Sequence, residues 1–420
     1  MMRKATPWGV AIILLFLASC SNNRILMAPI APASASTEHL PAKTSERSAG
    51  EQAITPELLK QKSIEAREFL KLVPVKEFAC TIREGRRRHK LKGREIALGL
   101  LDPVSRENRY AKIGICFSSP QKTLTVLDGN LPIRWLRGRG ITHFAFESSD
   151  DNAPPIVVDS KQWMRETQRG EYYFPYTDDF LFIEFVLDGA RFLLSQVRQA
   201  QEELCALNIR SRTFPLKKLC GVFPDNLVLN VALIEQIDED EFGNACPHEE
   251  MLPPHNRIFQ NCAEYSVFKV LVHYARNTYD AFRYVGSRAG AIGPMQFTRK
   301  TYRDIALNKY PEATLIRDFE TGARDLKNSI KAAMCLLDYE LSRMPPRVHQ
   351  IFLLDYRAGG LYPVVAYNGG KNRAQCLFRQ KRTGQCKANR SAWRETTGYI
   401  AKYQGIWYII DNLVSALEQN

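Results

Sequence analysis

Residues 224–235 read PDNLVLNVALIE. After the opening Pro-Asp-Asn, apolar residues stand 8, 7, 4, 3 and 1 positions before Glu235, a spacing that predicts a helix with one buried face. Glu235 ends that buried stripe. Apolar surroundings disfavour the charged form of a carboxyl group, so we expect the pKa of Glu235 to rise toward that of a general acid. Surface helices carry glutamates too, so this assignment needs support from elsewhere in the chain.

Three further motifs follow this helix in order. Residues 290–297 read GAIGPMQF, residues 365–370 read VAYNGG, and residues 395–399 read ETTGY. Glycines allow a backbone to approach a ligand closely, and Gln296 offers both a donor and an acceptor to a sugar or peptide group. Each motif alone is also typical of a turn or a helix, but their combination and order favour a functional site.

The four segments together resemble the lytic transglycosylase domain of bacterial murein-cleaving enzymes, the goose-lysozyme-like family. That family's pattern places a Leu eight residues before a catalytic Glu and continues with Gly-Ala-x-Gly-x-Met-Gln, Ala-Tyr-Asn-x-Gly and Glu-Thr-x-x-Tyr motifs. Leu227 stands eight residues before Glu235, and the later motifs match the segments quoted above. The resemblance covers about residues 224–410 and implies a mostly helical, lysozyme-like domain.

The resemblance also implies a reaction and a site. Glu235 would be the catalytic general acid and base, because the muramic acid's own C6 hydroxyl attacks C1 and no activated water is needed. The substrate would be the glycan strands of peptidoglycan, and the product a 1,6-anhydromuramoyl end. No metal and no cofactor are implied. The implied substrate-binding residues are Met295, Gln296, Tyr367, Asn368, Glu395 and Tyr399.

Two departures from the family pattern bear on the assignment of the acid. Gln236 stands where the family has Ser, and Gly290 follows Glu235 by 55 positions, which is longer than the family's spacing. We interpret residues 237–287 as an insertion. An alternative alignment anchors on Phe242 and makes Glu239 catalytic, but it would place Glu235 and Gln236 on the buried face of the helix.

Two alternative functions remain open at this stage. A lysozyme-like hydrolase would need a second carboxylate, which the acidic residues 238–241 offer. A peptidoglycan-binding or scaffolding lipoprotein without activity is the other, favoured by Gln236 and the long insertion. Release of anhydro products, release of reducing ends, or binding without release would distinguish the three.

The N-terminus predicts export and lipidation. Arg3 and Lys4 precede an apolar run from Trp8 to Ala18, which is too short to span a membrane but fits a secretory signal. The run ends in LASC, which resembles a lipobox, so residues 1–19 would be a signal peptide and Cys20 the lipidated residue. Ser21 favours the outer membrane, with the protein facing the periplasm. Residues 20–54 are rich in Ala, Pro, Ser and Thr and predict a flexible tether.

Composition limits the class of protein. The chain has 420 residues, a formal net charge of +13, 45% hydrophobic and 25% charged residues, close to the averages of globular proteins. Bulk disorder, a fibrous repeat and a multi-pass membrane protein are therefore excluded, and two or three domains are expected. The positive charge favours an acidic partner. Because of the export signal we expect no nucleic acid as partner and a membrane contact through Cys20.

The fold class predicted from the whole chain is α+β. Residues 55–178 begin with a helix over Thr55–Leu72 and continue as short apolar runs broken by turn residues, which predicts a mostly β module of unassigned role. Residues 179–420 have helical periodicity and predict the lysozyme-like domain. Within its insertion, the runs Val267–Tyr274 and Ala281–Val285 around Asn277 predict a hairpin.

The cysteines are consistent with an oxidising compartment. Ten are present, and lipidation of Cys20 leaves nine. Cys335 lies in an apolar helical stretch, where we expect a buried free thiol. The other eight form four near-neighbour pairs that suit local disulfides: Cys80 with Cys116, Cys205 with Cys220, Cys246 with Cys262, and Cys376 with Cys386. No zinc-binding spacing is present, so no metal site is predicted.

Overall fold

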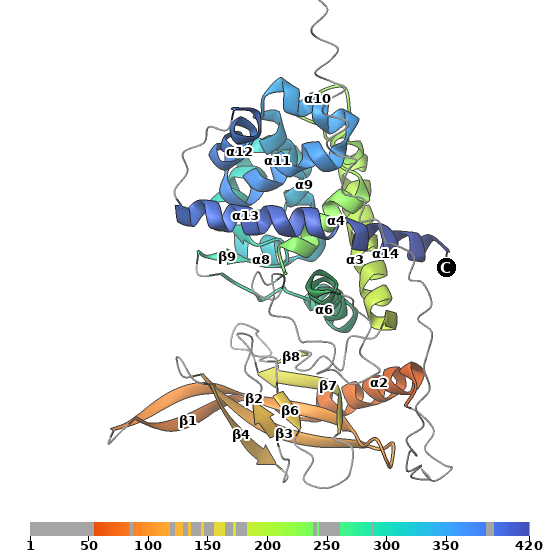
Figure 1. The fold of residues 1–420 in the computed structure, drawn as a ribbon, viewed down its shortest axis with the longest axis vertical. Helices are drawn as coiled ribbons and strands as arrows, with labels where there is room; N and C mark the ends of the chain where they lie inside the picture. Colours follow the sequence, from red (N-terminus) through yellow and green to blue (C-terminus); the bar gives the residue numbers. More distant parts are fainter. Residues whose placement is uncertain are drawn as a thin grey trace, which may run out of the picture. The chain divides into compact units, whose positions relative to one another are not determined.

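A computed structural model of the chain gives the fold (Figure 1). It describes residues 54–84, 87–117, 122–128, 133–135, 144–146, 155–163, 171–173, 183–237, 242, 261–287, 289–383 and 390–419. The predicted signal peptide, Cys20 and all but the last residue of the tether lie outside this part and stay predictions. The domain boundary expected near residue 178 also lies outside it. The architecture is mixed, mostly helical with a small antiparallel sheet, which agrees with the predicted α+β class.

The first part of the described chain is a helix packed on the antiparallel sheet. Helix α2 spans Pro56–Leu72 and begins at Thr55, whose hydroxyl accepts a hydrogen bond from the backbone N–H of Leu58. The sheet has the order β4-β3-β2-β7-β8, with β1 also paired to β2. A separate two-stranded sheet joins β5 and β6. The strands are β1 (Glu77–Glu84), β2 (Arg87–Leu101), β3 (Asn108–Phe117), β4 (Lys122–Asp128), β5 (Ile133–Trp135), β6 (Phe144–Phe146), β7 (Ile156–Trp163) and β8 (Glu171–Tyr173).

Buried apolar residues explain the central strands. In β2, Ile96, Leu98 and Leu100 are buried, and in β3 Ile113 and Ile115 are fully buried. Successive residues of a strand point to opposite faces, so each of these sets lies on one face of the sheet. The described residues between 77 and 173 lie mostly in strands.

The second part is helical. Two short strands, β9 and β10, form a hairpin beside the helices. The elements are α3 (Ile183–Ala206), η3 (Leu219–Gly221), α4 (Asp225–Ile234), α6 (Cys262–Asn277), η6 (Thr278–Asp280), β9 (Ala291–Ile292), β10 (Phe297–Thr298), α7 (Arg299–Arg303), η7 (Asp304–Lys309), η8 (Pro311–Ala313), α8 (Phe319–Arg324), α9 (Leu326–Ser342), α10 (Pro346–Leu354), α11 (Tyr356–Gly369), α12 (Lys371–Thr383), α13 (Arg390–Gly405) and α14 (Trp407–Gln419).

Helix α4 lies at the centre of the helical part. Every residue from Leu227 to Ile234 is buried, not only the predicted face. The reason is its surroundings, because α4 contacts α3, α9, α11, α13 and α14. A helix that is apolar on all sides is stable only when neighbours cover all of it. This central position fixes where the chain leaves α4, at Glu235.

The predicted hairpin at residues 267–285 is wrong. Residues Cys262–Asn277 form helix α6, which begins at Asn261; the side chain of Asn261 accepts hydrogen bonds from the N–H groups of Ala263 and Glu264. The β-branched residues of this run favour strands in isolation, but α6 packs along α3, and tertiary burial overrides that propensity.

A buried ion cluster joins the sheet to α6. Asp159 of β7 lies 2.7 Å from the Nε of Arg67 and 2.5 Å from a guanidinium nitrogen of Arg276. The Arg67 guanidinium also donates to the backbone carbonyl of Arg276. Because Asp159 is almost completely buried, its charge needs hydrogen-bonded cations beside it, which Arg67 and Arg276 provide.

One predicted disulfide is present between described residues, and the free thiol is confirmed. Cys205 at the end of α3 is bonded to Cys220, and Cys335 is free and buried. Cys116, Cys262 and Cys376 are also disulfide-bonded. The partners predicted for these three fall on side chains outside the described part, so those pairings stay predictions.

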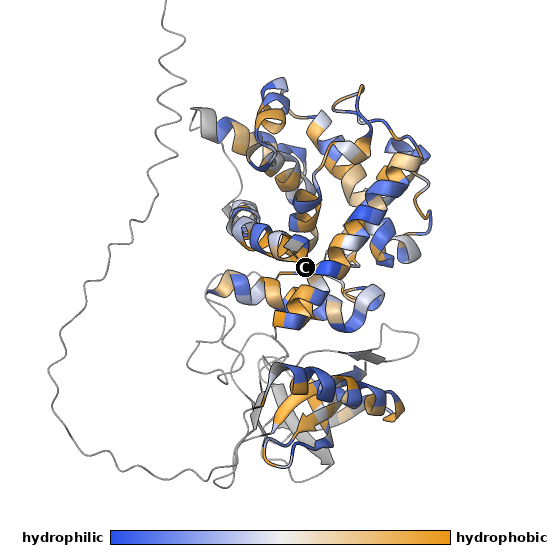
Figure 2. Ribbon diagram, turned by 90° about the vertical axis from the view of Figure 1, so that its right-hand side faces the viewer, coloured by the Kyte–Doolittle hydropathy of each residue, from blue (hydrophilic) through white to orange (hydrophobic). Residues whose placement is uncertain are grey.

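Along the described part of the chain, no helix is long and apolar enough to cross a membrane. The helices carry both hydrophobic and hydrophilic residues along their lengths (Figure 2).

Candidate functional site

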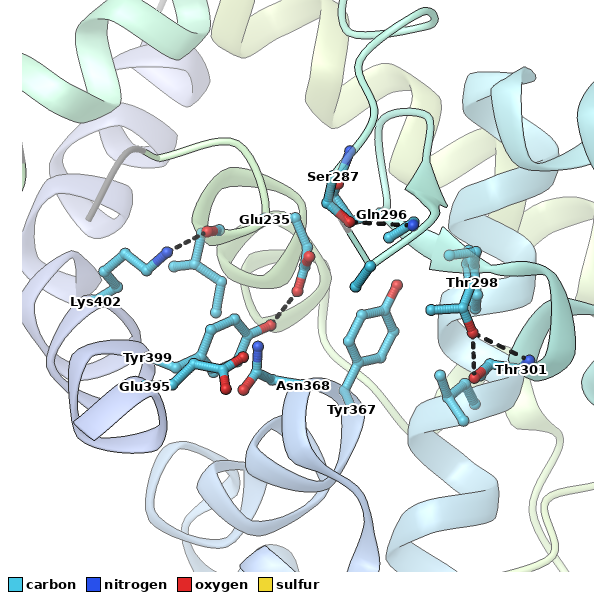
Figure 3. A pocket seen from close by; sticks show the side chains of 15 residues that line it. Glu235, Ser287, Gln296, Thr298, Thr301, Tyr367, Asn368, Glu395, Tyr399 and Lys402 are labelled. Carbon is cyan, nitrogen blue, oxygen red and sulfur yellow. Dashed lines mark hydrogen bonds between the residues drawn. The ribbon is translucent and has the colours of Figure 1, made fainter. Parts of the chain in front are cut away.

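A cleft of about 390 Å³ opens beside the C-terminal end of α4 (Figure 3). It is lined by residues from α4, the loop around β9 and β10, and helices α7, α9, α11 and α13. The lining residues are Ile234, Glu235, Ser287, Ala289, Ala291, Gln296, Phe297, Thr298, Thr301, Leu336, Tyr367, Asn368, Glu395, Tyr399 and Lys402. Five of the six residues predicted to bind substrate therefore lie around one cleft with Glu235, although they span more than 160 residues of sequence.

Glu235 lies at the wall of this cleft, directly after the last residue of α4. Its Oε1 accepts a hydrogen bond from the hydroxyl of Tyr399. Burial raises the pKa of Glu235 to about 7, although the hydrogen bond from Tyr399 and the positive charge of Lys402 act to lower it. Its Oε2 makes no hydrogen bond with any described residue. This oxygen can therefore carry a proton toward a ligand in the cleft.

Lys402 holds the chain on both sides of Glu235. Its Nζ donates to the backbone carbonyls of Ile234 and Ile237, each at 3.1 Å. The carbonyl of Ile234 is the last of α4, where a cation is favoured because unpaired carbonyls gather there, and that of Ile237 follows three residues later. Lys402 also lies beside the ring of Tyr399, with its Nζ 5.5 Å from the ring centroid. One side chain thus fixes the backbone around Glu235 and supplies a charge close to it.

The loop before β10 carries a strained residue into the cleft. Gln296 has φ of +46°, a left-handed conformation that costs a non-glycine residue about 1 kcal/mol or more. Its side-chain nitrogen donates to the carbonyl of Gly293 at 2.8 Å. Gly293 itself has φ of +78°, and a Cβ there would lie 1.9 Å from the carbonyl oxygen of Ala323. Only glycine fits this position, so the turn that presents Gln296 depends on it.

Gln236 ties this loop to the end of α4. Its side-chain nitrogen donates to the carbonyl of Pro294 at 2.8 Å and lies 3.4 Å from that of Gly293. This contact depends on the length of the Gln side chain, and a Ser at this position would be too short to make it. Glu235 and Gln296 are positioned relative to each other partly through Gln236.

Helix α11 contributes Tyr367 and Asn368. The hydroxyl of Tyr367 donates to the backbone carbonyl of Met295 at 2.6 Å, and its ring packs edge-on against Phe297. Burial raises the pKa of both Tyr367 and Tyr399 well above the usual value, and the nearby carboxyl of Glu235 adds to the effect. Both phenols therefore stay neutral hydrogen-bond donors. Asn368 is exposed in the cleft, and its side chain makes no hydrogen bond to another described residue.

Met295 and Glu395 differ in how they lie relative to the cleft. The Met295 side chain is completely buried and does not line the cleft; its contribution is the carbonyl that Tyr367 holds. Glu395 lines the cleft but is exposed, and its carboxylate lies 3.1 Å from the guanidinium of Arg373. Glu239 itself lies outside the described part; Ile237 before it and Phe242 after it are the described residues that flank it.

Lys402 and Ser287 are cleft residues that the sequence analysis did not identify. Lys402 stands three residues after Tyr399, one helical turn further along α13, so the helical period predicts that it lies on the same face. Ser287 precedes the motif by three residues and had no comparable signal. Its hydroxyl accepts from the backbone N–H of Ala291 at 3.1 Å.

The described residues contain no cluster of three or more His, Cys, Asp or Glu side chains suited to a metal ion. What the cleft offers instead is one carboxyl group that can give and take a proton, two neutral phenols, and amide groups from Gln296 and Asn368. Such a set suits proton transfer to a neutral polar ligand.

Comparison of the chain with protein families, with curated proteins and with solved structures finds no match.

Proposed function

We propose that this protein is a peptidoglycan lytic transglycosylase in which Glu235 acts first as general acid and then as general base. The observation that carries the proposal is the position of Glu235 in the cleft, with a pKa raised to about 7 and a hydrogen bond from Tyr399. A group with such a pKa is present in both protonation states near neutral pH. It can therefore protonate the leaving oxygen and later accept the proton of the attacking hydroxyl.

The other cleft residues support a reaction that needs one carboxyl group. Among the described lining residues, the only other carboxyl is that of Glu395, whose exposed carboxylate pairs with Arg373. Hydrolytic glycosidases generally use two carboxyl groups, one of which activates water or attacks the sugar. An attack by the substrate's own C6 hydroxyl removes the need for the second.

The substrate class is proposed from the same residues and from charge. The amides of Gln296 and Asn368 can donate to and accept from the N-acetyl groups of a glycan. The formal net charge of +13 suits a polymer whose peptide stems carry carboxylates. Lipidation at Cys20 and a place at the outer membrane facing the periplasm complete the proposal, because they would bring the enzyme to this polymer.

The decisive experiment is digestion of purified sacculi with the mature protein and with its Glu235→Gln and Glu239→Gln variants. Soluble products are identified by mass spectrometry. We expect 1,6-anhydromuropeptides from the wild type and from Glu239→Gln, and a loss of at least about a hundredfold in rate for Glu235→Gln, as for removal of a general acid.

Three results would contradict the proposal in different ways. Anhydro products lost only in Glu239→Gln would move the acid to that residue. Reducing-end products would indicate a hydrolase. Binding to sacculi without any soluble product would favour a scaffolding lipoprotein.

A further inference from the structure

A second cavity adjoins the Glu235 cleft. It has a volume of about 730 Å³ and shares Thr301 and Leu336 with that cleft. Thr301 lies on the side of the cleft away from Lys402 (Figure 3). The cavity, called the basic cavity below, is formed by α7, η7 and α9, and its other lining residues are Lys300, Arg303, Asp304, Ile305, Asn308, Tyr339, Glu340 and Arg343.

The charges of the basic cavity do not balance. Both of its acidic residues already have cations: Asp304 lies 4.0 Å from Lys309, and Glu340 lies 2.9 Å from Arg343. The side chains of Lys300 and Arg303, by contrast, make no hydrogen bond or ion pair with any described residue. Two positive charges are therefore left at the cavity wall, which favours an anionic ligand.

The cavity also contains an acceptor that no described residue satisfies. Glu340 is 6% exposed, and its Oε2 is buried without a hydrogen-bond partner. A buried acceptor without a hydrogen bond destabilises the folded protein, and its presence in a cavity wall is consistent with a ligand that supplies the donor. Burial also raises the pKa of Glu340, against the opposing effect of Arg343. An N–H group of a ligand would satisfy Oε2.

From these observations we propose that the basic cavity binds the peptide stem of the glycan strand held in the Glu235 cleft. Its carboxylates would lie at Lys300 and Arg303, and one of its N–H groups at Glu340. The proposal rests on the proposed function, because it takes the ligand of the adjoining cleft to be peptidoglycan. A stem carries both carboxylates and N–H groups on one short branch, and this is the combination that the cavity complements.

The test compares two substrates and two double variants. The substrates are glycan strands with their peptide stems and the same strands after the stems have been removed by an amidase. The test variant is Lys300→Gln with Arg303→Gln. The matched control is Arg299→Gln with Arg317→Gln, which removes the same charge from neighbouring positions that do not line the cavity.

We expect wild type to have a higher kcat/KM for stem-bearing strands than for bare strands. In the test variant the ratio of kcat/KM for stem-bearing strands to that for bare strands should fall on the order of tenfold, mainly because KM for stem-bearing strands rises. A fall of this size is expected from the loss of two charge-assisted contacts. The control should keep the wild-type preference. An unchanged preference in the test variant, or an equal fall in the control, would overturn the proposal.

A binding measurement separates failure of this proposal from failure of the proposed function. Calorimetry with Glu235→Gln compares a disaccharide carrying a tetrapeptide stem with the same disaccharide lacking it. If wild type releases no anhydro product, the proposed function is wrong. The calorimetric comparison of the two disaccharides then tests separately whether the basic cavity binds the peptide stem. Equal affinity for both ligands would contradict the cavity's assignment.

Discussion

The hydroxyl of Tyr399 on α13 donates a hydrogen bond to Oε1 of Glu235 at the end of α4. This contact favours the charged form of the carboxyl group, whereas burial favours the neutral form, and burial dominates. The pKa of about 7 is thus the outcome of two opposed effects that come from different helices.

Replacing Tyr399 with Phe should raise the pKa of Glu235 further, because it removes a hydrogen bond to the carboxylate. We expect the alkaline limb of the pH profile of kcat/KM to move to higher pH. The rate near pH 7 should fall by about tenfold or more, the value of a hydrogen bond to a charged group. Tyr408→Phe is the control, since that exposed tyrosine of α14 contacts Asn261 and Glu264 away from the cleft. An alkaline limb that does not move would show that the contact has no part in the proton transfer.

Lys402 provides a second test of the same balance. Its charge lowers the pKa of Glu235, so Lys402→Met should also move the alkaline limb to higher pH. Lys402→Arg keeps the charge and should stay close to wild type in this respect. The pH dependence of kcat/KM for both variants checks the prediction. A similar shift in both would indicate that geometry at the end of α4, rather than charge, is responsible.

The raised pKa of Glu235 also predicts a pH-dependent stability. Below about pH 4.5 Glu235 is protonated in both the folded and the unfolded protein and does not affect the free energy of unfolding. Between pH 4.5 and 7 the carboxyl group is charged in the unfolded chain but still protonated in the folded protein, so the free energy of unfolding falls as pH rises. Glu235→Gln removes this cost, which is at most about 3 kcal/mol for this shift. We therefore expect the variant to exceed wild type in free energy of unfolding at pH 8 but not at pH 4. Urea titrations at the two pH values measure it, and an equal difference at both would contradict the assigned pKa.

Gln236 should matter for the loop rather than for the acid. Gln236→Ala removes the donor to the carbonyls of Gly293 and Pro294, and Gln236→Glu keeps the shape but also lacks the N–H group. We expect both variants to raise KM several-fold and to increase amide exchange in residues 290–297, with little change in the pH profile. Wild-type exchange in either variant would mean that the loop is held without Gln236.

Much of this site could be predicted from the sequence because several of its residues belong to short motifs that can be recognised locally. A glycine turn, a Tyr-Asn pair and a helical period can be recognised without tertiary structure, and Gln296, Tyr367 and Tyr399 lie with Glu235 around one cleft. It failed where tertiary contacts decide. Helix α6 has a strand-like composition, but its packing against α3 makes it helical.

The same limit applies to individual side chains. Met295 belongs to a recognisable motif, yet its burial depends on how the loop folds back on α11. The basic cavity could not be predicted from the sequence. Arg303 and Glu340 lie on separate helices, and no local sequence pattern indicates that these helices are close together.

Substitutions at two glycines of the loop before β10 allow the effect of backbone strain to be distinguished from that of a steric clash. Both have left-handed backbones, with φ of +80° at Gly290 and +78° at Gly293. A Cβ at Gly290 would meet nothing within 4 Å, whereas one at Gly293 would overlap the carbonyl of Ala323. Gly290→Ala should therefore cost only the conformational strain, about 1 kcal/mol of unfolding free energy.

Gly293→Ala should cost clearly more, about 3 kcal/mol, because the overlap forces the loop away from α8. It should also reduce activity far more than Gly290→Ala, since the displaced loop carries Gln296. Urea unfolding and sacculus digestion of the two variants side by side measure both effects. Equal losses in the pair would mean that the loop adapts to the added methyl group, and that the close contact with Ala323 does not fix the position of Gln296.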